Sequence, residues 1–326
     1  MALKSVLGAA IVEFGAAGSA GIVAGGLHEG TVQIWRLSSE GGVSSGQCLG
    51  QFETLFVSGA STLALRADGQ IVVAGSSAAA GRLAAYDTAT GDKLWERTRL
   101  KYPRKLCSSP SRGHFWCGSD SAAHRIDFET GASLEIVRGA QGCFEGQFDH
   151  ELFETKADAN YILRGTKTLE IRRLTSAVLD VAFGAERFCV SESGGPVRCF
   201  GYSSAEELWR FDPEPGTHVL RLHHDTADGG FYGVVLRFEQ RAPERLVRFD
   251  AGTGRSALLR ELDRETAHLF LPTTRQLVEA SGKVYDLASG QLAATLPFPQ
   301  REYPDPENFE AWLEAEFEKP PRDGAK

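Results

Sequence analysis

Residues 85–95 read Ala-Tyr-Asp-Thr-Ala-Thr-Gly-Asp-Lys-Leu-Trp, and weakened copies of this stretch recur downstream. Three copies keep the aspartate and the glycine four residues later, and a looser copy at 199–205 keeps the closing tryptophan. The repeated positions are Asp87, Gly91, Trp95, Asp127, Gly131, Asp250, Gly254, Asp286, Gly290 and Trp209. An aspartate opens a turn by bonding the backbone ahead of it, and a glycine supplies the positive φ that closes the turn. These residues are therefore expected to form turns and to dock neighbouring repeats.

The spacing of the copies sets the architecture. The four aspartates lie 40, 123 and 36 residues apart, so the long gap holds about three periods of ~41 residues. Between the turns run short stretches rich in β-branched and aromatic residues, which is typical of strands. A period near ~40 residues made of short strands is the signature of a β-propeller. We therefore expect an all-β fold over residues 1–299.

The second repeat is the clearest. Its strands are expected at 61–66, 71–75, 82–87 and 93–97, with a turn at 67–70. The same order of four strands fits the rest of the chain. Blades are expected at 4–52, 61–97, 103–138, 143–176, 178–212, 217–262 and 266–298. Seven blades are predicted, with six or eight as alternatives.

Two parts of this assignment are open. In blade four, 169–174 is interpreted as the third strand, which leaves no room for more than a very short outer strand before 178–183 begins blade five. The N-terminus resembles a signal peptide, but glycines and Glu13 break its apolar run. We interpret it as the first strand of the fold, and we expect a cytoplasmic protein.

The pattern changes in the last residues. Residues 301–326 carry eight acidic and four basic side chains. Asp305 and Pro306 are typical of a helix start. The residues that follow at i, i+3, i+4 and i+8 form one apolar helix face, and they are Phe309, Trp312, Leu313 and Phe317. An acidic tail with a short helix is expected over 300–326, and its apolar face either packs on the propeller rim or binds a protein partner.

Composition narrows the classes of partner. The net charge is −8, and no dense cluster of Lys and Arg occurs, so nucleic acid is not an expected partner. No run of eighteen apolar residues is present, so no membrane span is expected. Six cysteines include no Cys-x-x-Cys pair at zinc spacing. Cys107 with Cys117, and Cys189 with Cys199, could face each other across turns, but we expect buried reduced thiols, with Cys117 and Cys189 in the small-residue position of Ala74.

Residues 85–95 resemble the docking motif of pyrroloquinoline-quinone-type propeller repeats, Ala-x-Asp-x-x-Thr-Gly-x-x-x-Trp. Residues 30–37 are similar instead to the third strand of a WD-repeat blade, with arginine at the position of the terminal aspartate. The resemblance extends over residues 1–298 at the level of architecture. It implies fold and not function, because such repeats serve enzymes and scaffolds alike.

Catalytic chemistry finds little support in the sequence. The quinoprotein resemblance would imply a bound quinone with calcium and adjacent cysteines, and this chain has no adjacent cysteines. We expect no cofactor. His223, His224, Asp225 and Asp228 gather possible metal ligands, but adjacent strand residues point to opposite faces, so we interpret 223–230 as a polar hairpin. The acidic residues between Glu145 and Glu154 are not placed pairwise by any motif.

The sequence therefore predicts a non-enzymatic protein-interaction propeller. A narrower version is an immunity protein that neutralises a bacterial toxin, because an acidic binder suits a basic partner. Two alternatives stay open. One is a hydrolase or lyase acting on a small sugar or ester at the central channel, and the other is a structural subunit of a larger assembly.

Overall fold

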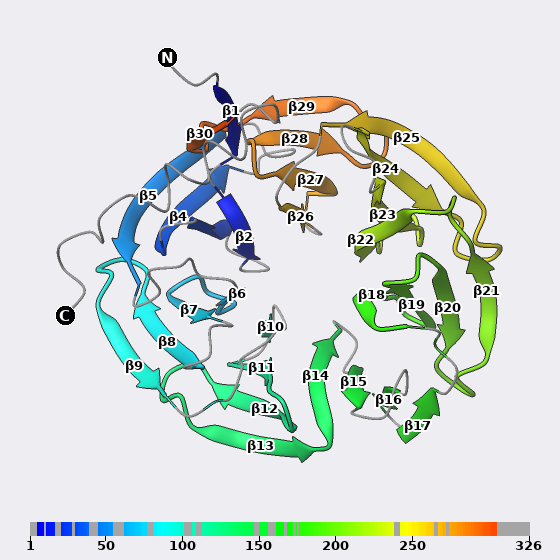
Figure 1. The fold of residues 1–326 in the computed structure, drawn as a ribbon, viewed down its shortest axis with the longest axis horizontal. Coiled ribbons are helices and arrows are strands. Elements are labelled where there is room, and N and C mark those ends of the chain that lie inside the picture. Colours follow the sequence, from blue (N-terminus) through cyan, green and yellow to red (C-terminus); the bar gives the residue numbers. More distant parts are fainter. Residues whose placement is uncertain are drawn as a thin grey trace.

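The computed structural model describes residues 5–9, 11–16, 21–27, 30–38, 45–54, 62–76, 81–98, 100, 106–108, 113–146, 150–155, 161–165, 168–171, 174, 176–237, 242–263, 267–271 and 274–304. Seven four-stranded antiparallel sheets stand around a central axis as the blades of one ring (Figure 1). Within each blade the strands pair in chain order from the axis outward. The predicted seven-bladed propeller is confirmed, and the alternatives of six and eight blades are wrong.

Blades two and three follow the predicted ranges closely, and blade one begins later than predicted, at Ile11. Blade one contains β2 (Ile11–Ala16), β3 (Ile22–Leu27), β4 (Thr31–Ser38) and β5 (Ser45–Glu53). Blade two contains β6 (Thr62–Leu65), β7 (Ile71–Ser76), β8 (Arg82–Asp87) and β9 (Lys93–Arg97). Blade three contains β10 (Leu106–Ser108), β11 (His114–Gly118), β12 (Ala122–Asp127) and β13 (Ser133–Arg138).

The remaining blades complete the ring. Blade four contains β14 (Ala140–Glu145), β15 (Glu151–Thr155), β16 (Tyr161–Arg164) and β17 (Thr168–Ile171). Blade five contains β18 (Val178–Phe183), β19 (Arg187–Glu192), β20 (Val197–Gly201) and β21 (Glu207–Phe211). Blade six contains β22 (Thr217–His224), β23 (Phe231–Arg237), β24 (Glu244–Phe249) and β25 (Ser256–Leu262). Blade seven contains β26 (His268–Leu271), β27 (Gln276–Glu279), β28 (Lys283–Asp286) and β29 (Leu292–Thr295).

Blade four corrects one strand assignment. Its third strand is β16, and the residues interpreted from sequence as the third strand overlap β17, which is the outer strand and only four residues long. The blade also begins earlier than expected, because Gly139 alone joins β13 to β14. This glycine takes a positive φ of 82°, which turns the chain into the new blade without a longer loop.

The N-terminal strand is a second correction. β1 (Ser5–Ala9) does not belong to blade one; it pairs antiparallel with β30 (Gln300–Pro304), and the two form a separate ribbon. Figure 1 shows this ribbon at the periphery, beside β5 and β29. β30 covers the first five residues of the acidic tail, and the predicted helix after it lies outside the described residues.

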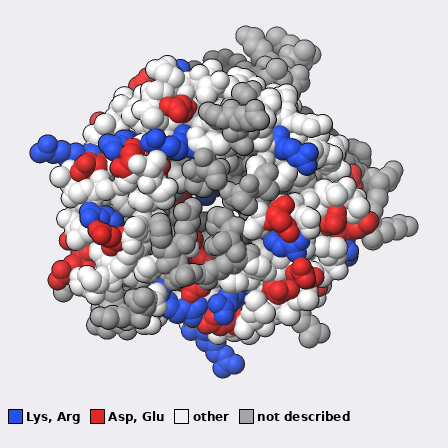
Figure 2. Space-filling view, turned by 180° about the vertical axis from the view of Figure 1, so that it is seen from behind, with Lys and Arg blue, Asp and Glu red and all other residues white. Residues whose placement is uncertain are grey.

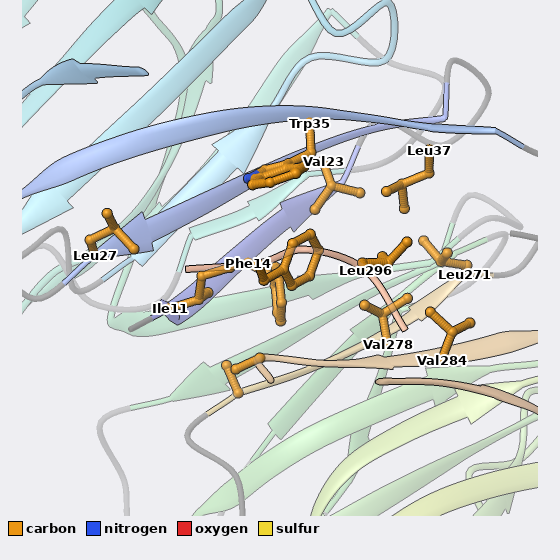
Figure 3. Close-up of a cluster of buried hydrophobic side chains, with 13 residues drawn as sticks. Ile11, Phe14, Val23, Leu27, Trp35, Leu37, Leu271, Val278, Val284 and Leu296 are labelled. Atoms are coloured by element: carbon orange, nitrogen blue, oxygen red, sulfur yellow. The ribbon is translucent and has the colours of Figure 1, made fainter. Parts of the chain in front are cut away.

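The ring closes between blade seven and blade one through an apolar cluster (Figure 3). Blade one supplies Trp35 and Leu37, and the segment after β29 supplies Leu296 and Phe298. The rings of Trp35 and Phe298 meet edge to face with centroids 4.9 Å apart. This geometry is favourable for aromatic pairs. The end of the last blade therefore packs directly against the first blade.

Candidate functional site

The four repeated aspartates close turns with the same geometry. Asp127 Oδ1 accepts the N–H groups of Glu129 at 3.0 Å and Thr130 at 2.8 Å, and also the Thr130 hydroxyl at 2.8 Å. Asp87, Asp250 and Asp286 accept the equivalent bonds in blades two, six and seven. The Thr90 and Ala89 N–H groups lower the pKa of Asp87, because hydrogen bonds to a carboxylate favour its charged form.

The glycine of each turn lies close to the preceding blade, against an aromatic ring at Gly91, Gly131 and Gly254 and against the Leu259 carbonyl at Gly290. Gly91, Gly131, Gly254 and Gly290 all have positive φ values between 67° and 77°. A Cβ built on Gly131 would lie 2.7 Å from Trp95 Cδ2, and one on Gly254 would lie 2.5 Å from Trp209 Cε3. Phe52 lies against Gly91 in the same way. Glycine is therefore needed at these positions for two reasons. The backbone has a positive φ, and the neighbouring blade approaches too closely for a Cβ.

Both tryptophans also donate a hydrogen bond across the blade interface. Trp95 Nε1 donates to the carbonyl of Phe128 and Trp209 Nε1 donates to the carbonyl of Ala251, each at 2.8 Å. Each acceptor is the residue that directly follows a motif aspartate. Trp95 also stacks on Phe115, with ring planes 2° apart. The contacts of Trp95 therefore join blade two to blade three, and those of Trp209 join blade five to blade six.

Blade five departs from this pattern. Ala205 occupies the position of the motif glycine and adopts a positive φ of 54°, which is unusual for a residue with a Cβ. The sequence of β17, Thr-Leu-Glu-Ile, contains no aromatic residue. The ring of His150 stacks on Tyr202 instead, with centroids 3.8 Å apart. A histidine from a hairpin of blade four therefore takes the place of the docking aromatic ring, beside the apolar cluster that the two blades share.

A buried ionic cluster joins blades three and four. The Trp116 indole N–H and the Arg164 guanidinium both donate to Glu151, and Arg164 also bonds Glu135. Arg164 lies over the Trp116 ring, 5.6 Å from its centroid. The hydrogen bond from Arg164 holds the pKa of Glu135 below its ordinary value, although burial opposes this.

Two carboxylates that the sequence did not place together are brought face to face in this cluster. Glu145 on β14 lies directly opposite Glu151 on β15. Glu145 Oε1 lies 3.4 Å from His114 Nε2 of blade three. The signal in the sequence was the acidic stretch, but the register that pairs its ends depends on the hairpin between them. The arrangement holds two blades together, because each acid faces a cation or histidine of blade three or four.

A second ionic cluster lies between blades six and seven. Arg275 donates to the buried carboxylate of Asp225 at 2.6 Å and lies 3.4 Å from Asp228. Burial disfavours the charged form of Asp228, but bonds from the Gly230 N–H and the Tyr232 hydroxyl outweigh it and lower the pKa of Asp228. Arg275 has a positive φ of 54°. Such a conformation is kept only where the surroundings hold it, and here two carboxylates do so.

The adjacent histidines point to different blades, as expected for neighbouring strand residues. His223 stacks on Phe270 of blade seven, and His224 packs against Phe231 within its own blade and against Gly184 of blade five. Burial lowers the pKa of His223 to about 4, so its ring is neutral at physiological pH. Within the described ranges, no three His, Cys, Asp or Glu side chains are arranged to hold a metal ion.

The partner-binding residues expected from sequence, Phe309, Trp312, Leu313 and Phe317, lie outside the described residues. The large exposed apolar side chains of the described part all lie on outer strands. They are Leu49, Leu94, Leu134, Ile136, Leu208, Leu258 and Leu292. Figure 2 shows basic and acidic side chains interspersed over the described part of one face, without a large area of one sign. No helix in the described part is long and apolar enough to cross a membrane.

No protein-family profile matches the chain, and no curated protein matches it in sequence. Solved structures do match the fold. The structure of U3-55K aligns with a TM-score of 0.64 at 12% identity, covering 85% of this chain and 90% of that one. The WD40 repeats of RRP9 align with a TM-score of 0.65 at 12% identity, covering 85% and 89%.

A chain from the mitotic checkpoint complex aligns with a TM-score of 0.61 at 14% identity, covering 79% of this chain and 80% of that one. At these identities the likeness concerns the fold alone. Together with the seven sheets and their docking turns, it shows that this chain is a β-propeller of WD-repeat-like architecture.

Proposed function

We propose that this propeller is a non-enzymatic protein-interaction module that acts in the cytoplasm. The observation that carries the proposal is the β1–β30 ribbon at the periphery of the ring, from which the acidic tail continues. The outer strand of a blade is an edge strand whose outward side can receive a partner. Titratable residues of the two ionic clusters make hydrogen bonds between blades, which is a structural role. The alignment with WD40 propellers supports the same class of function by analogy of fold.

The proposed docking element is the acidic tail with its apolar residues Phe309, Trp312, Leu313 and Phe317. Its starting point supports this. The tail continues directly from β30, which pairs with β1 at the periphery of the ring. The apolar tail residues, set among acidic ones, would present a mixed surface to a partner.

A narrower form of the proposal is neutralisation of a basic bacterial toxin. The net charge of −8 and the acidic tail support it, because opposite charge accelerates encounter and favours the correct partner. Binding of this kind would weaken as salt is added, since exposed charges are screened.

The test is affinity capture from the native lysate with three forms of the protein. These are the full chain, a chain ending at Pro304, and the full chain with Trp312→Ala. Ending at Pro304 keeps β30 and its pairing with β1. We expect one stoichiometric partner on the full chain, and loss of that partner from both altered forms. Failure of the full chain to retain any protein would contradict the interaction module. Equal retention by all three forms would contradict the tail as the docking element.

A further inference from the structure

Two hairpins in this protein carry cysteines ten residues apart in the chain, but only one hairpin brings them together. Cys189 on β19 lies directly opposite Cys199 on β20. In the other hairpin the register is displaced by one residue: Cys107 faces Trp116, and Cys117 faces Leu106. Directly opposite residues have side chains on the same face of the sheet. The Cys189 and Cys199 thiols therefore meet, and the Cys107 and Cys117 thiols point to opposite faces.

The backbone hydrogen bonds show which kind of pair Cys189 and Cys199 form. The N–H of Glu192 donates to the carbonyl of Pro196 at 3.0 Å, and the N–H of Tyr202 donates to the carbonyl of Glu186 at 3.3 Å. Bonded and non-bonded pairs alternate along an antiparallel ladder. Counting inward from either end makes 189 and 199 a non-hydrogen-bonded pair.

Such a pair suits a disulfide. Its Cα atoms lie about 4.5 Å apart, and disulfides join residues whose Cα atoms are about 4.4–6.8 Å apart. The side chains of a non-hydrogen-bonded pair are also closer than those of its neighbours. Only rotation of the side chains and a small adjustment of the two strands would be needed to bring the sulfurs into bonding distance.

Both thiols are free in this structure, and their surroundings limit how fast they react. Each side chain is fully buried, among the apolar residues that join blade five to blade six. Burial raises the pKa of the Cys189 thiol well above its usual range. A thiol reacts with oxidants as the thiolate, so Cys189 reacts slowly at neutral pH and only when the blade opens locally. Trp209, which docks on blade six, lies directly opposite Cys199 on β21.

We propose that Cys189 and Cys199 are a register-matched pair that a hydroperoxide converts into a cross-strand disulfide when blade five opens locally. One thiolate attacks a peroxide oxygen, the O–O bond breaks, and a sulfenic acid and hydroxide form. The second thiol then attacks the sulfenic sulfur, and its S–H proton leaves with the departing hydroxyl as water. In total the two thiols lose two electrons and two protons, and hydrogen peroxide is reduced to two molecules of water. The bond changes the packing beside Trp209.

The test uses the intact protein and hydrogen peroxide. After exposure, free thiols are alkylated in denaturant, and the protein is digested with trypsin and examined by mass spectrometry. Cleavage after Arg187 and Arg198 places the two cysteines on separate peptides, 188–198 and 199–210. Cleavage after Lys105, Arg112 and Arg125 does the same for Cys107 and Cys117. The second pair is an internal control with equal spacing in sequence.

We expect a linked pair of peptides 188–198 and 199–210, lighter by two hydrogens than their sum, and no link between 106–112 and 113–125. The link should form faster as pH rises and disappear on reduction. Trp209 fluorescence should change in wild type on oxidation and stay unchanged with Cys199→Ala. Oxidation of Cys107 or Cys48 without a link between Cys189 and Cys199 would overturn the proposal. Equal linkage of both hairpins would also overturn it, because register would then not select the pair.

Discussion

Replacing Gly131 with alanine tests how the blades are joined, because the structure separates two costs at this position. The first cost is the backbone, since φ is +67°. An L-residue in this region loses about 1–2 kcal/mol. The second cost is steric, since the new Cβ would lie 2.7 Å from Trp95 Cδ2 and 2.9 Å from Cε3. Displacing a packed ring costs about 1–3 kcal/mol. We expect Gly131→Ala to lower the free energy of unfolding by about 2–5 kcal/mol.

Gly229 provides a matched control. Its φ is +70°, and an added Cβ would meet no atom within 4 Å. Gly229→Ala should therefore show the backbone cost alone, about 1–2 kcal/mol. A second control places Gly131→Ala in a Trp95→Ala background, where the ring is absent and the extra cost should vanish. That difference is a coupling energy of about 1–3 kcal/mol between Gly131 and Trp95.

The assay is urea unfolding followed by circular dichroism, with midpoints compared at equal slope. Gly131→Ala should be clearly less stable than Gly229→Ala, because only the Cβ at 131 meets a neighbouring ring. If both replacements shift the midpoint equally, Trp95 does not press on Gly131 as described. If Trp95→Ala leaves the cost of Gly131→Ala unchanged, the two residues are not coupled and the docking geometry is refuted.

Three further outcomes are expected from the interfaces between blades. Trp209→Phe should lower the free energy of unfolding by about 1–3 kcal/mol, because it removes the indole N–H donor and part of the ring. An unchanged unfolding midpoint in urea would contradict this. His268→Ala should lower the free energy of unfolding by about 1–3 kcal/mol, because it removes the buried ring whose Nε2 lies 2.8 Å from the buried Glu244 carboxyl group; the same urea titration measures this, and a cost near that of an exposed substitution would show that the pair is unimportant. The hydrogen bond from Arg164 lowers the pKa of Glu135, so its stabilising contribution is complete above the ordinary carboxyl pKa and is lost as pH falls through the lower folded value. Thermal midpoints between about pH 6 and pH 3 should therefore fall more steeply for wild type than for Glu135→Gln, and equal slopes would contradict the assignment.

Local turn chemistry made much of this fold predictable. The four strands of blade two end within a residue or two of their expected bounds, because an aspartate and a glycine mark the turns after β6 and β8. Burial of Cys117 also follows the repeat, since it faces blade two as Ala74 faces blade one. Cys189 is buried on the opposite face, toward blade six. The repeat pattern therefore predicts that a side chain is buried more reliably than it predicts which neighbouring blade the side chain faces.

The missed features depend on contacts between distant residues. Blade four carries no aspartate–glycine turn, so its strands could not be counted from the repeated motif, and the residues of β17 were assigned to the third strand. The pairing of β1 with β30 joins the two ends of the chain, and no short motif encodes it. The opposition of Glu145 and Glu151 follows from the register of one hairpin. Register is set by packing on both faces of a sheet, which a single sequence does not display.

The most direct test of the interaction module is calorimetric titration of the captured partner against three purified proteins. These are the full chain, the chain ending at Pro304, and a Leu134→Asp variant. Leu134 is 53% exposed on β13 of blade three, away from the β1–β30 ribbon. The Leu134→Asp variant therefore tests whether an exposed apolar residue on a distant outer strand contributes to binding. We predict that the full chain and the Leu134→Asp variant bind alike, and that the shortened chain loses binding while keeping its unfolding midpoint. Full binding by the shortened chain would contradict docking through the tail, and absence of binding by the full chain would contradict the interaction module itself.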